Sequence, residues 1–376
     1  MALVFVDGFD HYNIADVTRK WSAQVTSASN PVPSMDTGRL GSGQSYKTIS
    51  VNSSYGVNVL TQPYPSALTT GGCGFAFKVN AYATFSTPSG VLKNGFLTVW
   101  DGGGNIPHLV LMYNSDGSLS VKRPNGSATL YYSPPLNIVT GGNIPLNTWT
   151  YIEFKWTLHA TAGTVAVSLN GVPTLSASEV RTFNQLQTGS GSASGLCFLG
   201  MSGIEGPYTG GGYHGPIGTA LWLDDVYMFD NNTGVTNFLG DVTVNTKLVT
   251  DNGTTNNGVA STGDQHSCVD ETLADTADYV TVDAVNKIEL YQVADLAAGT
   301  AIKGVQVTAL AKRTTEGSSK ITAETRQSGA NYAHPTPQGV TTDYAFRPFI
   351  YEKDALGATW TDTAFNAMEF GVKKTV

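Results

Sequence analysis

Residues 219–248 read TALWLDDVYMFDNNTGVTNFLGDVTVNTKL, and this stretch decides how the chain is organised. From 221 to 229 the residues alternate between two faces and are rich in β-branched and aromatic types, which predicts a strand. The turn-forming run DNNTG at 230–234 ends that strand, and a second alternating segment follows at 242–248. We therefore interpret the stretch as the boundary between two β domains, with one strand completing the first and another beginning the second.

The length and composition suit two all-β domains. A chain of 376 residues is long enough to give each domain a core of its own. Its 42 glycines and its low share of charged residues, 13%, are typical of proteins with many turns and little helix. We expect one domain at 1–235 and a second at 236–376.

The first domain has the spacing of a β-sandwich. Strand-like segments recur roughly every ten to twenty residues, as a sandwich requires. Two hairpin turns are marked, NSDG at 114–117 and Asn170-Gly171. The second is a strong signal because both central positions of such a turn favour positive φ. The strands expected here are 73–80, 95–100, 108–113, 118–123, 149–157, 164–169 and 196–201.

The second domain has alternating segments of its own, which predict a smaller antiparallel sandwich. The longest segment, 301–311, changes phase at Gly304, where we expect a bulge. One short helix is expected at 361–370, with Thr361 or Asp362 as its cap and Gly371 as its stop. The other strands expected here are 278–282, 287–291, 320–326 and 344–352.

Charge and cysteine patterns exclude several classes of function. The net charge is −8 and no basic patch is visible, which argues against nucleic acid as a partner. Cys73, Cys197 and Cys268 lack C-x-x-C spacing and the six histidines are scattered, so we expect no disulfide framework, metal or cofactor. The N-terminus has no basic leader, and no apolar run approaches the roughly 20 residues of a membrane helix. We expect neither a signal peptide nor membrane insertion.

Several motifs of the first domain resemble one known fold. They are LNTW at 146–149, YIEF at 151–154, GTVAV at 163–167, LNG at 169–171 and DDVY at 224–227. In this order they resemble the concanavalin A-like (laminin-G-like) jelly-roll sandwich. The resemblance implies an all-β protein, with an N-terminal concanavalin A-like jelly roll and a second, smaller antiparallel β-sandwich that carries one short C-terminal helix.

Other segments resemble a group of bacteriophage virion proteins that carry such a domain. These segments are FVDGFDHY at 5–12, residues 224–230 followed by FLGDV at 238–242, and the C-terminal residues 360–373. The resemblance spans most of the chain, and its motifs are structural. It implies a virion protein made in the host cytoplasm. Its expected partners are other virion proteins and the protein itself, as a homo-oligomer.

The acidic residues of the first domain do not form the pair that a glycan hydrolase of this fold would use. Retaining glycosidases place two carboxylates close together, whereas Glu153, Glu179 and Glu205 are far apart in the sequence. Asp224 and Asp225 are adjacent, so a regular strand would send them to opposite faces. We interpret these two as residues that bond loop backbone, with a calcium or glycan role as the alternative. No catalytic residue and no enzyme activity are expected.

A glycine-rich loop at 203–218 carries the candidate binding residues, Tyr208, Tyr213 and His214. Tyrosine is enriched at protein interfaces, and aromatic rings on a surface loop can also stack on sugar rings. We interpret this loop as a contact with a neighbouring subunit, with a glycan contact as the alternative. A solvated loop histidine is the simpler interpretation of His214.

Together these observations favour a structural role. The predicted function is a non-enzymatic bacteriophage virion protein, in the tail or on the capsid surface, that acts through subunit–subunit interfaces. The alternative is a glycan-binding adhesin module that recognises the host cell envelope and possesses no catalytic residues. A polysaccharide-degrading tail enzyme is disfavoured by the missing pair of acids.

Overall fold

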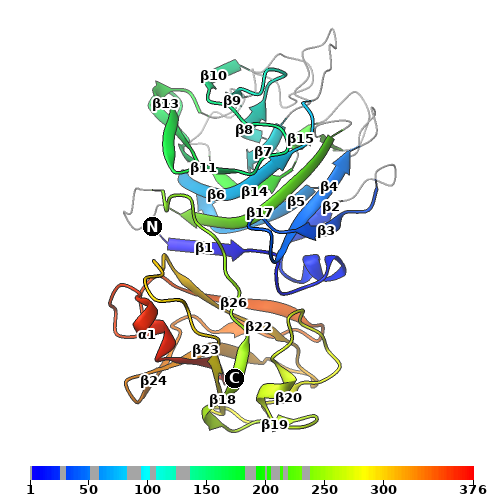
Figure 1. Ribbon diagram of the computed structural model, residues 1–376, viewed down its shortest axis with the longest axis vertical. Coiled ribbons are helices and arrows are strands. Elements are labelled where there is room, and N and C mark those ends of the chain that lie inside the picture. The colour runs from blue at the N-terminus through cyan, green and yellow to red at the C-terminus, as the bar shows by residue number, and fades with distance from the viewer. Residues whose placement is uncertain are drawn as a thin grey trace. The chain divides into compact units, whose positions relative to one another are not determined.

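The computed structural model describes residues 2–25, 31–50, 59–82, 95–101, 107–123, 136–182, 192–199, 201–204, 212–214, 219–230 and 238–376. Its elements are mostly antiparallel strands (Figure 1). Two compact units are present, each built from two segments. Unit 1 is Met1–Phe9 with Trp21–Val244, and unit 2 is Asp10–Lys20 with Asn245–Val376. The domain limits expected from the sequence, 1–235 and 236–376, stay a prediction.

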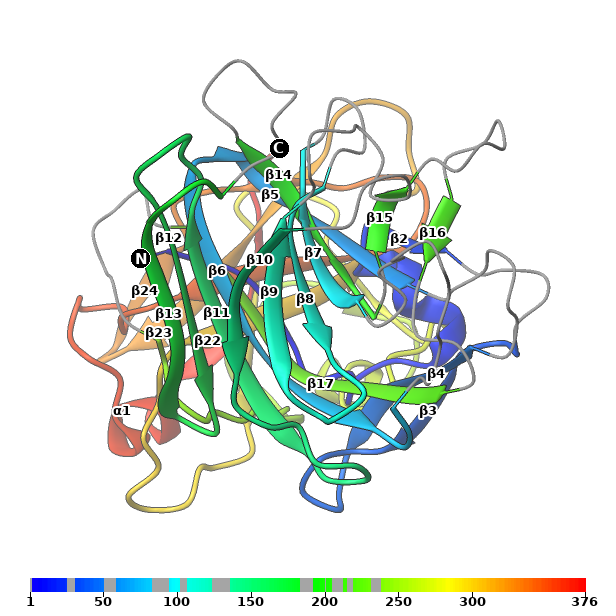
Figure 2. The ribbon, with the colours of Figure 1, turned by 90° about the horizontal axis from the view of Figure 1, so that it is seen from above.

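Unit 1 is a sandwich of two antiparallel sheets (Figure 2). The first sheet has eight strands, and its central strand is the one predicted at 221–229. Its strands, in spatial order, are β13 (Val172–Val180), β12 (Gly163–Leu169), β11 (Thr150–Thr157), β6 (Thr70–Val79), β17 (Thr219–Asp230), β4 (Gln44–Ser50) and β3 (Ser34–Thr37), with β1 (Ala2–Asp7) pairing β17.

The second sheet of unit 1 has seven strands. In spatial order they are β10 (Leu136–Gly141), β9 (Leu119–Arg123), β8 (Pro107–Tyr113), β7 (Gly95–Trp100), β14 (Ala193–Phe198), β5 (Val59–Leu68) and β2 (Ala23–Val25). A separate pair, β15 (Met201–Ile204) and β16 (Gly212–His214), completes the unit. The chain crosses between the two sheets several times, as from β5 to β6 and from β6 to β7, which is the jelly-roll arrangement expected from the sequence.

Aromatic side chains from both sheets fill the space between them. Phe75 and Phe77 alternate along β6 and both point into this core. Phe77 stacks on Phe96 of β7 with ring centroids 4.4 Å apart, and Phe75 meets the edge of Phe198 on β14 at 5.4 Å. All four rings are completely buried. Large buried rings of this kind contribute much of the apolar area that stabilises a sandwich.

Every strand expected in unit 1 is present, and the predicted fold class is confirmed. One element is not. The alternating segment at 242–248 is not a strand, and the next strand begins only at β18 (Val249–Asn256). Instead of pairing in a ladder, the backbone N–H of Val244 donates to the carboxylate of Asp225, 2.7 Å away. The alternating pattern of this segment therefore does not correspond to a strand.

Unit 2 is the smaller sandwich. Its main sheet runs β18, β21 (Ile288–Val293), β27 (Glu369–Lys374), β23 (Lys320–Gln327) and β24 (Ala330–Ala333), with β25 (Gln338–Gly339) also on β23. The two-stranded antiparallel sheet of β22 (Val305–Ala311) and β26 (Ala345–Tyr351) supplies a second layer. Two small elements, the pair β19 (Val259–Ala260) with β20 (Val280–Thr281) and the 3-10 helix η2 (His266–Cys268), lie in the same unit, as does the 3-10 helix η1 (Ile14–Arg19).

The short C-terminal helix is present but ends earlier than predicted. Helix α1 covers Asp362–Asn366, and the Thr361 hydroxyl caps it by accepting from the N–H of Ala364 at 3.1 Å. The expected continuation to 370 is wrong, because Phe370 belongs to β27 and pairs with strands on both sides. Sheet pairing and a shared core determine where the helix ends. That core consists of Trp360, Phe365, Met368 and Phe370, against which Val305, Val307 and Tyr351 of the two-stranded sheet pack.

Candidate functional site

The loop residues singled out from the sequence stay a prediction. Tyr208 lies outside the described residues. Tyr213 and His214 lie on β16, where His214 pairs with Met201 of β15, but their side chains are outside the described part of the chain. The interface role and the glycan role of this loop therefore both remain open as predictions.

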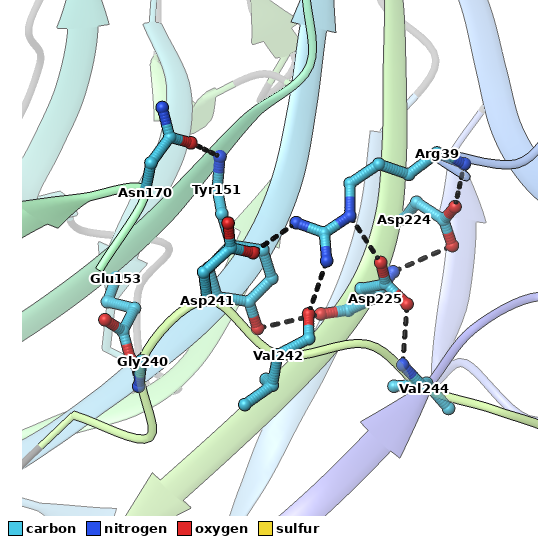
Figure 3. Close-up of polar contacts among 10 residues, drawn as sticks. All are labelled: Arg39, Tyr151, Glu153, Asn170, Asp224, Asp225, Gly240, Asp241, Val242 and Val244. Atoms are coloured by element: carbon cyan, nitrogen blue, oxygen red, sulfur yellow. Dashed lines mark hydrogen bonds and ion pairs between the residues drawn. The ribbon is translucent and has the colours of Figure 1, made fainter. Parts of the chain in front are cut away.

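A network of polar side chains holds segment 238–244 against the outer face of the eight-stranded sheet (Figure 3). Arg39 is at its centre. Its guanidinium forms ion pairs with Asp225 at 2.9 Å and Asp241 at 2.5 Å, and donates to the carbonyl of Val242 at 2.7 Å. The same guanidinium lies over the ring of Tyr151, 4.8 Å from its centroid. One residue thereby ties the sheet to the segment that covers it.

Asp224 and Asp225 both act on this side of the sheet. Asp224 accepts from the backbone N–H of Arg39 at 2.8 Å, and Asp225 accepts from Val244. The prediction that they face opposite ways is wrong because β17 contains a bulge at this point, with Asp225 in the left-handed region at φ 49°. Their expected role in bonding loop backbone is confirmed. Burial raises the pKa of Asp225. The hydrogen bond from the Val244 N–H and the positive charge of Arg39 act in the opposite direction and lower it.

Glu153, the acid considered for hydrolysis, belongs to the same polar network that holds segment 238–244 against the sheet. It is 1% exposed and accepts from the hydroxyl of Tyr227 at 2.6 Å and from the N–H of Gly240 at 2.8 Å. Burial, together with the charge of Glu153, raises the pKa of Tyr227. Glu153 is thus occupied in fixing segment 238–244 and is closed to a large substrate.

The outer face of the seven-stranded sheet has a different character. Along β9, Leu119 and Val121 are fully buried in the core, so the alternate residues Ser120 and Lys122 point outward. The Ser120 hydroxyl lies 2.8 Å from that of Thr140 on β10, and Thr140 in turn donates to Asn137 at 2.9 Å. This row of hydroxyl and amide groups is continuous with Lys122, which pairs with Asn137 in the sheet.

Lys122 is the cation beside this row. Lys122 is half-buried, and burial lowers its pKa. The next residue, Arg123, has its pKa lowered by burial and by the nearby positive charge of Arg181. Arg123 and Arg181 therefore lie near each other, whereas strand alternation sends Arg123 to the opposite face of β9 from Lys122.

An aromatic residue and an imidazole complete the same face. Trp100, at the end of β7, is half-buried and packs against Val59 and Cys197. His108 on β8 is fully buried, with Nε2 3.1 Å from the carbonyl oxygen of Ser192. Burial lowers the pKa of His108, which favours the neutral ring at pH 7. Sequence reasoning did not find this group, although the outward positions of the predicted strands 108–113 and 118–123 already contained His108 and Lys122.

Within the described ranges, no three His, Cys, Asp or Glu side chains come close enough together to hold a metal ion. The three cysteines are buried and unpaired with one another. No helix in the part of the chain that the structure describes is long and apolar enough to cross a membrane.

Comparison with solved structures finds similar β-sandwich proteins. An endo-β-1,4-glucuronan lyase from the fungus Trichoderma reesei is 12% identical over 61% of this chain and 96% of that one, with a TM-score of 0.42. An alginate lyase is 12% identical over 60% and 95%, with a TM-score of 0.37. The catalytic domain of a glycoside hydrolase family 131 protein from Coprinopsis cinerea is 13% identical over 64% and 99%, with a TM-score of 0.35. No family model and no curated protein sequence matches the chain.

This comparison corrects two predictions. The expected non-enzymatic virion structural protein, acting through subunit interfaces, is contradicted, because the similar structures are lyases and a hydrolase of polysaccharides. The expected absence of enzyme activity is contradicted on the same ground. The reasoning failed because a missing carboxylate pair excludes only the glycosidase mechanisms that use one.

Proposed function

We propose that unit 1 is a carbohydrate-active domain that takes an acidic polysaccharide across the outer face of its seven-stranded sheet. The observation that carries this proposal is the position of Lys122. It is a half-buried cation on an outward-facing strand position, and it stands next to a row of hydroxyl and amide groups. A uronic acid presents the matching chemistry, one carboxylate and several hydroxyls on each sugar.

Each group has a distinct task in this proposal. The ammonium of Lys122 pairs with a sugar carboxylate and neutralises it, and a partly desolvated cation gains more from such a pair than an exposed one. Thr140 and Asn137 are exposed and bonded to each other, and the buried Ser120 holds Thr140 from behind, so the hydroxyls of a sugar meet groups whose rotamers are already fixed. The half-buried ring of Trp100 offers an apolar surface for the carbon face of a sugar.

The proposal is tested by replacing Lys122 and measuring both binding and chain cleavage. Glucuronan and alginate, on which two of the similar structures act, are suitable first polymers. Lys122→Met removes one charge-assisted contact of about 1.5–3 kcal/mol, so affinity should fall at least about tenfold. The control is Lys155→Met, which removes another half-buried lysine from β11 of the other sheet. Equal binding by the Lys122 variant and the parent, with an unchanged melting temperature, would overturn the proposal.

We also infer, from the sequence resemblance alone, that this domain is carried on a bacteriophage particle. The resemblance rests on residues 5–12, 224–230, 238–242 and 360–373. Other virion proteins and further copies of the chain are then its expected partners, and the host cytoplasm is its place of synthesis. Mass spectrometry of purified particles from a lysate that makes this chain tests the inference. Its absence from particles that are otherwise complete would refute it.

A further inference from the structure

A row of alternating tryptophan and lysine side chains crosses the other sheet of unit 1. Trp222 on β17 pairs with Lys78 on β6 and with Lys47 on β4. Trp149 immediately precedes β11, whose first residue pairs with Phe77, so it extends the row by one strand. In order across the sheet the row is Trp149, Lys78, Trp222 and Lys47. With neighbouring strands about 4.8 Å apart, it is about 14 Å long.

The row lies on the outer face of the sheet. Phe77, Leu223 and Tyr46, the sequence neighbours of Lys78, Trp222 and Lys47, are completely buried in the core. Because successive residues of a strand point to opposite faces, the members of the row point away from that core. Trp149, Lys78 and Lys47 are half-buried, whereas Trp222 is 9% exposed. The row is therefore a surface feature whose second tryptophan is covered by its neighbours.

Each ammonium lies against an indole ring. Lys78 Nζ is 4.7 Å from the ring centroid of Trp149 and 4.4 Å from that of Trp222. Lys47 Nζ is 5.1 Å from the centroid of Trp222. A cation within about 6 Å of a ring centroid is attracted to the ring. These contacts restrict both lysine side chains, so a ligand would not have to order them.

The two lysines differ in their remaining contacts. Lys47 forms an ion pair with Asp36 at 3.0 Å, and Asp36 also accepts from the indole N–H of Trp222 at 2.9 Å. These two contacts, the indole bond foremost, lower the pKa of Asp36 to about 2, so it is ionised and neutralises Lys47. No carboxylate forms an ion pair with Lys78 among the residues the structure describes. With Lys47 paired to Asp36, Lys78 supplies the net positive charge of the row.

Burial also lowers the pKa of Lys78, which means that its ammonium has lost part of its water, and the charge of Asp36 opposes this effect only in part. Next to it, Asn80 is exposed, and its amide oxygen accepts from the N–H of Ala220 at 2.8 Å. This bond fixes the Asn80 side chain and leaves its NH2 group as a donor at the edge of the row. A half-buried ring, a poorly solvated cation and an amide donor stand together.

We propose that this row is a second binding site for an acidic polysaccharide, separate from the site on the seven-stranded sheet. A uronic acid stacks its carbon face on Trp149, its carboxylate pairs with Lys78, and a hydroxyl accepts from Asn80. The neighbouring sugars of the chain continue along the row toward Lys47.

The charge of the row favours a polysaccharide over a nucleic acid. Two lysines and Asp36 sum to a single positive charge, which suits a polymer with well-separated carboxylates. A nucleic acid carries one phosphate charge on every nucleotide and is held by several cations at once. The net charge of −8 on the chain would also repel it.

The test measures binding of a purified uronic-acid oligosaccharide to the full chain by calorimetry, together with its stoichiometry. Trp149→Ala and Lys78→Met should each abolish one class of sites or weaken it at least about tenfold. Lys78→Arg should restore most of the binding because it keeps the charge. Tyr279→Ala, which removes an aromatic residue that is 49% exposed in unit 2, is the control and should bind like the parent.

The outcomes separate this inference from the proposed function. Lys122→Met should leave the row's sites intact, and Trp149→Ala should leave the seven-stranded sheet's site intact. If both row variants keep the parent's stoichiometry and affinity at an unchanged melting temperature, the inference is refuted. If a neutral oligosaccharide binds as tightly as the acidic one, or a single-stranded oligonucleotide displaces it, the assigned ligand class is wrong. Should Trp149→Ala unfold the domain, the pair Lys78→Met and Lys78→Arg decides alone.

Discussion

Replacing Arg39 with Met should destabilise unit 1 strongly at neutral pH. The Arg39 side chain is 10% exposed and its partner Asp225 is 6% exposed, so the substitution leaves a buried carboxylate without its cation. Removing one partner of a buried pair costs about 3–5 kcal/mol. For a unit of this size that corresponds to a fall in melting temperature of roughly 6–20 °C.

The loss should shrink as the pH falls. Burial already raises the pKa of Asp225 above 3.8 in the folded state, and removing Arg39 raises it further. A carboxyl whose pKa is raised by folding binds more protons when folded, so stability increases as the pH drops through its folded pKa toward the ordinary value. Arg39→Met should therefore be most destabilised relative to the parent at pH 7, and much less so once the pH has fallen well below the raised Asp225 pKa of the variant, toward the ordinary value.

Thermal unfolding of both proteins at a series of pH values measures this, and a double-mutant cycle with Asp225→Asn isolates the pair. The control is Arg19→Met. Arg19 pairs with Asp16 at 3.1 Å with 35% of its side chain exposed, and such a pair contributes at most about 1 kcal/mol. A loss below about 1 kcal/mol for Arg39→Met, independent of pH, would refute the account of Arg39 as the tie between sheet and segment.

Three further predictions concern other contacts. Glu153→Gln should lower the melting temperature, because it weakens the bond to Tyr227, yet leave polysaccharide binding unchanged in calorimetry; loss of binding would show that Glu153 is open to substrate. Thr361→Ala should cost unit 2 about 1 kcal/mol in chemical unfolding, since it removes the cap on Ala364, whereas Thr361→Ser should cost little. Deleting Asp225 removes the extra residue of the bulge, so the strand should pair regularly and the core should keep its packing. The near-ultraviolet circular dichroism should then match that of the parent, and loss of this signal would contradict the prediction.

The sequence predicted the fold well because the fold depends on local alternation and turn chemistry. Phe75 and Phe77 alternate with outward residues in a way that any strand must show, and the Asn170-Gly171 turn fixes the hairpin of β12 and β13. The errors lie where long-range contacts prevail over local pattern. Glu369 has helical spacing from Phe365 but begins β27 and pairs with Arg326 instead, a choice that only the sheet can reveal.

The candidate sites were harder to predict because their members are distant in the sequence. Lys78 and Trp222 are neighbours only through the register of β6 with β17, and Lys122 meets Asn137 only through the register of β9 with β10. A single sequence shows that each residue is outward-facing but not which strands adjoin. A carboxylate pair on one strand can be recognised from its spacing in the sequence, whereas cationic groups assembled across several strands cannot.

The bulge in β17 explains how one strand serves two tasks on the outer face of its sheet. Trp222 and Asp224 point outward by ordinary alternation, and Asp225 is an additional outward residue in the left-handed region. After this insertion the alternation continues in phase, so Tyr227 points outward to Glu153 while its neighbours Val226 and Met228 stay fully buried. The extra carboxylate recruits Arg39 and Val244, which cover the half of the strand beyond the bulge. The half before the bulge keeps Trp222 in the row with Lys78 and Lys47, so one inserted residue divides the face between a covered region and a half-exposed one.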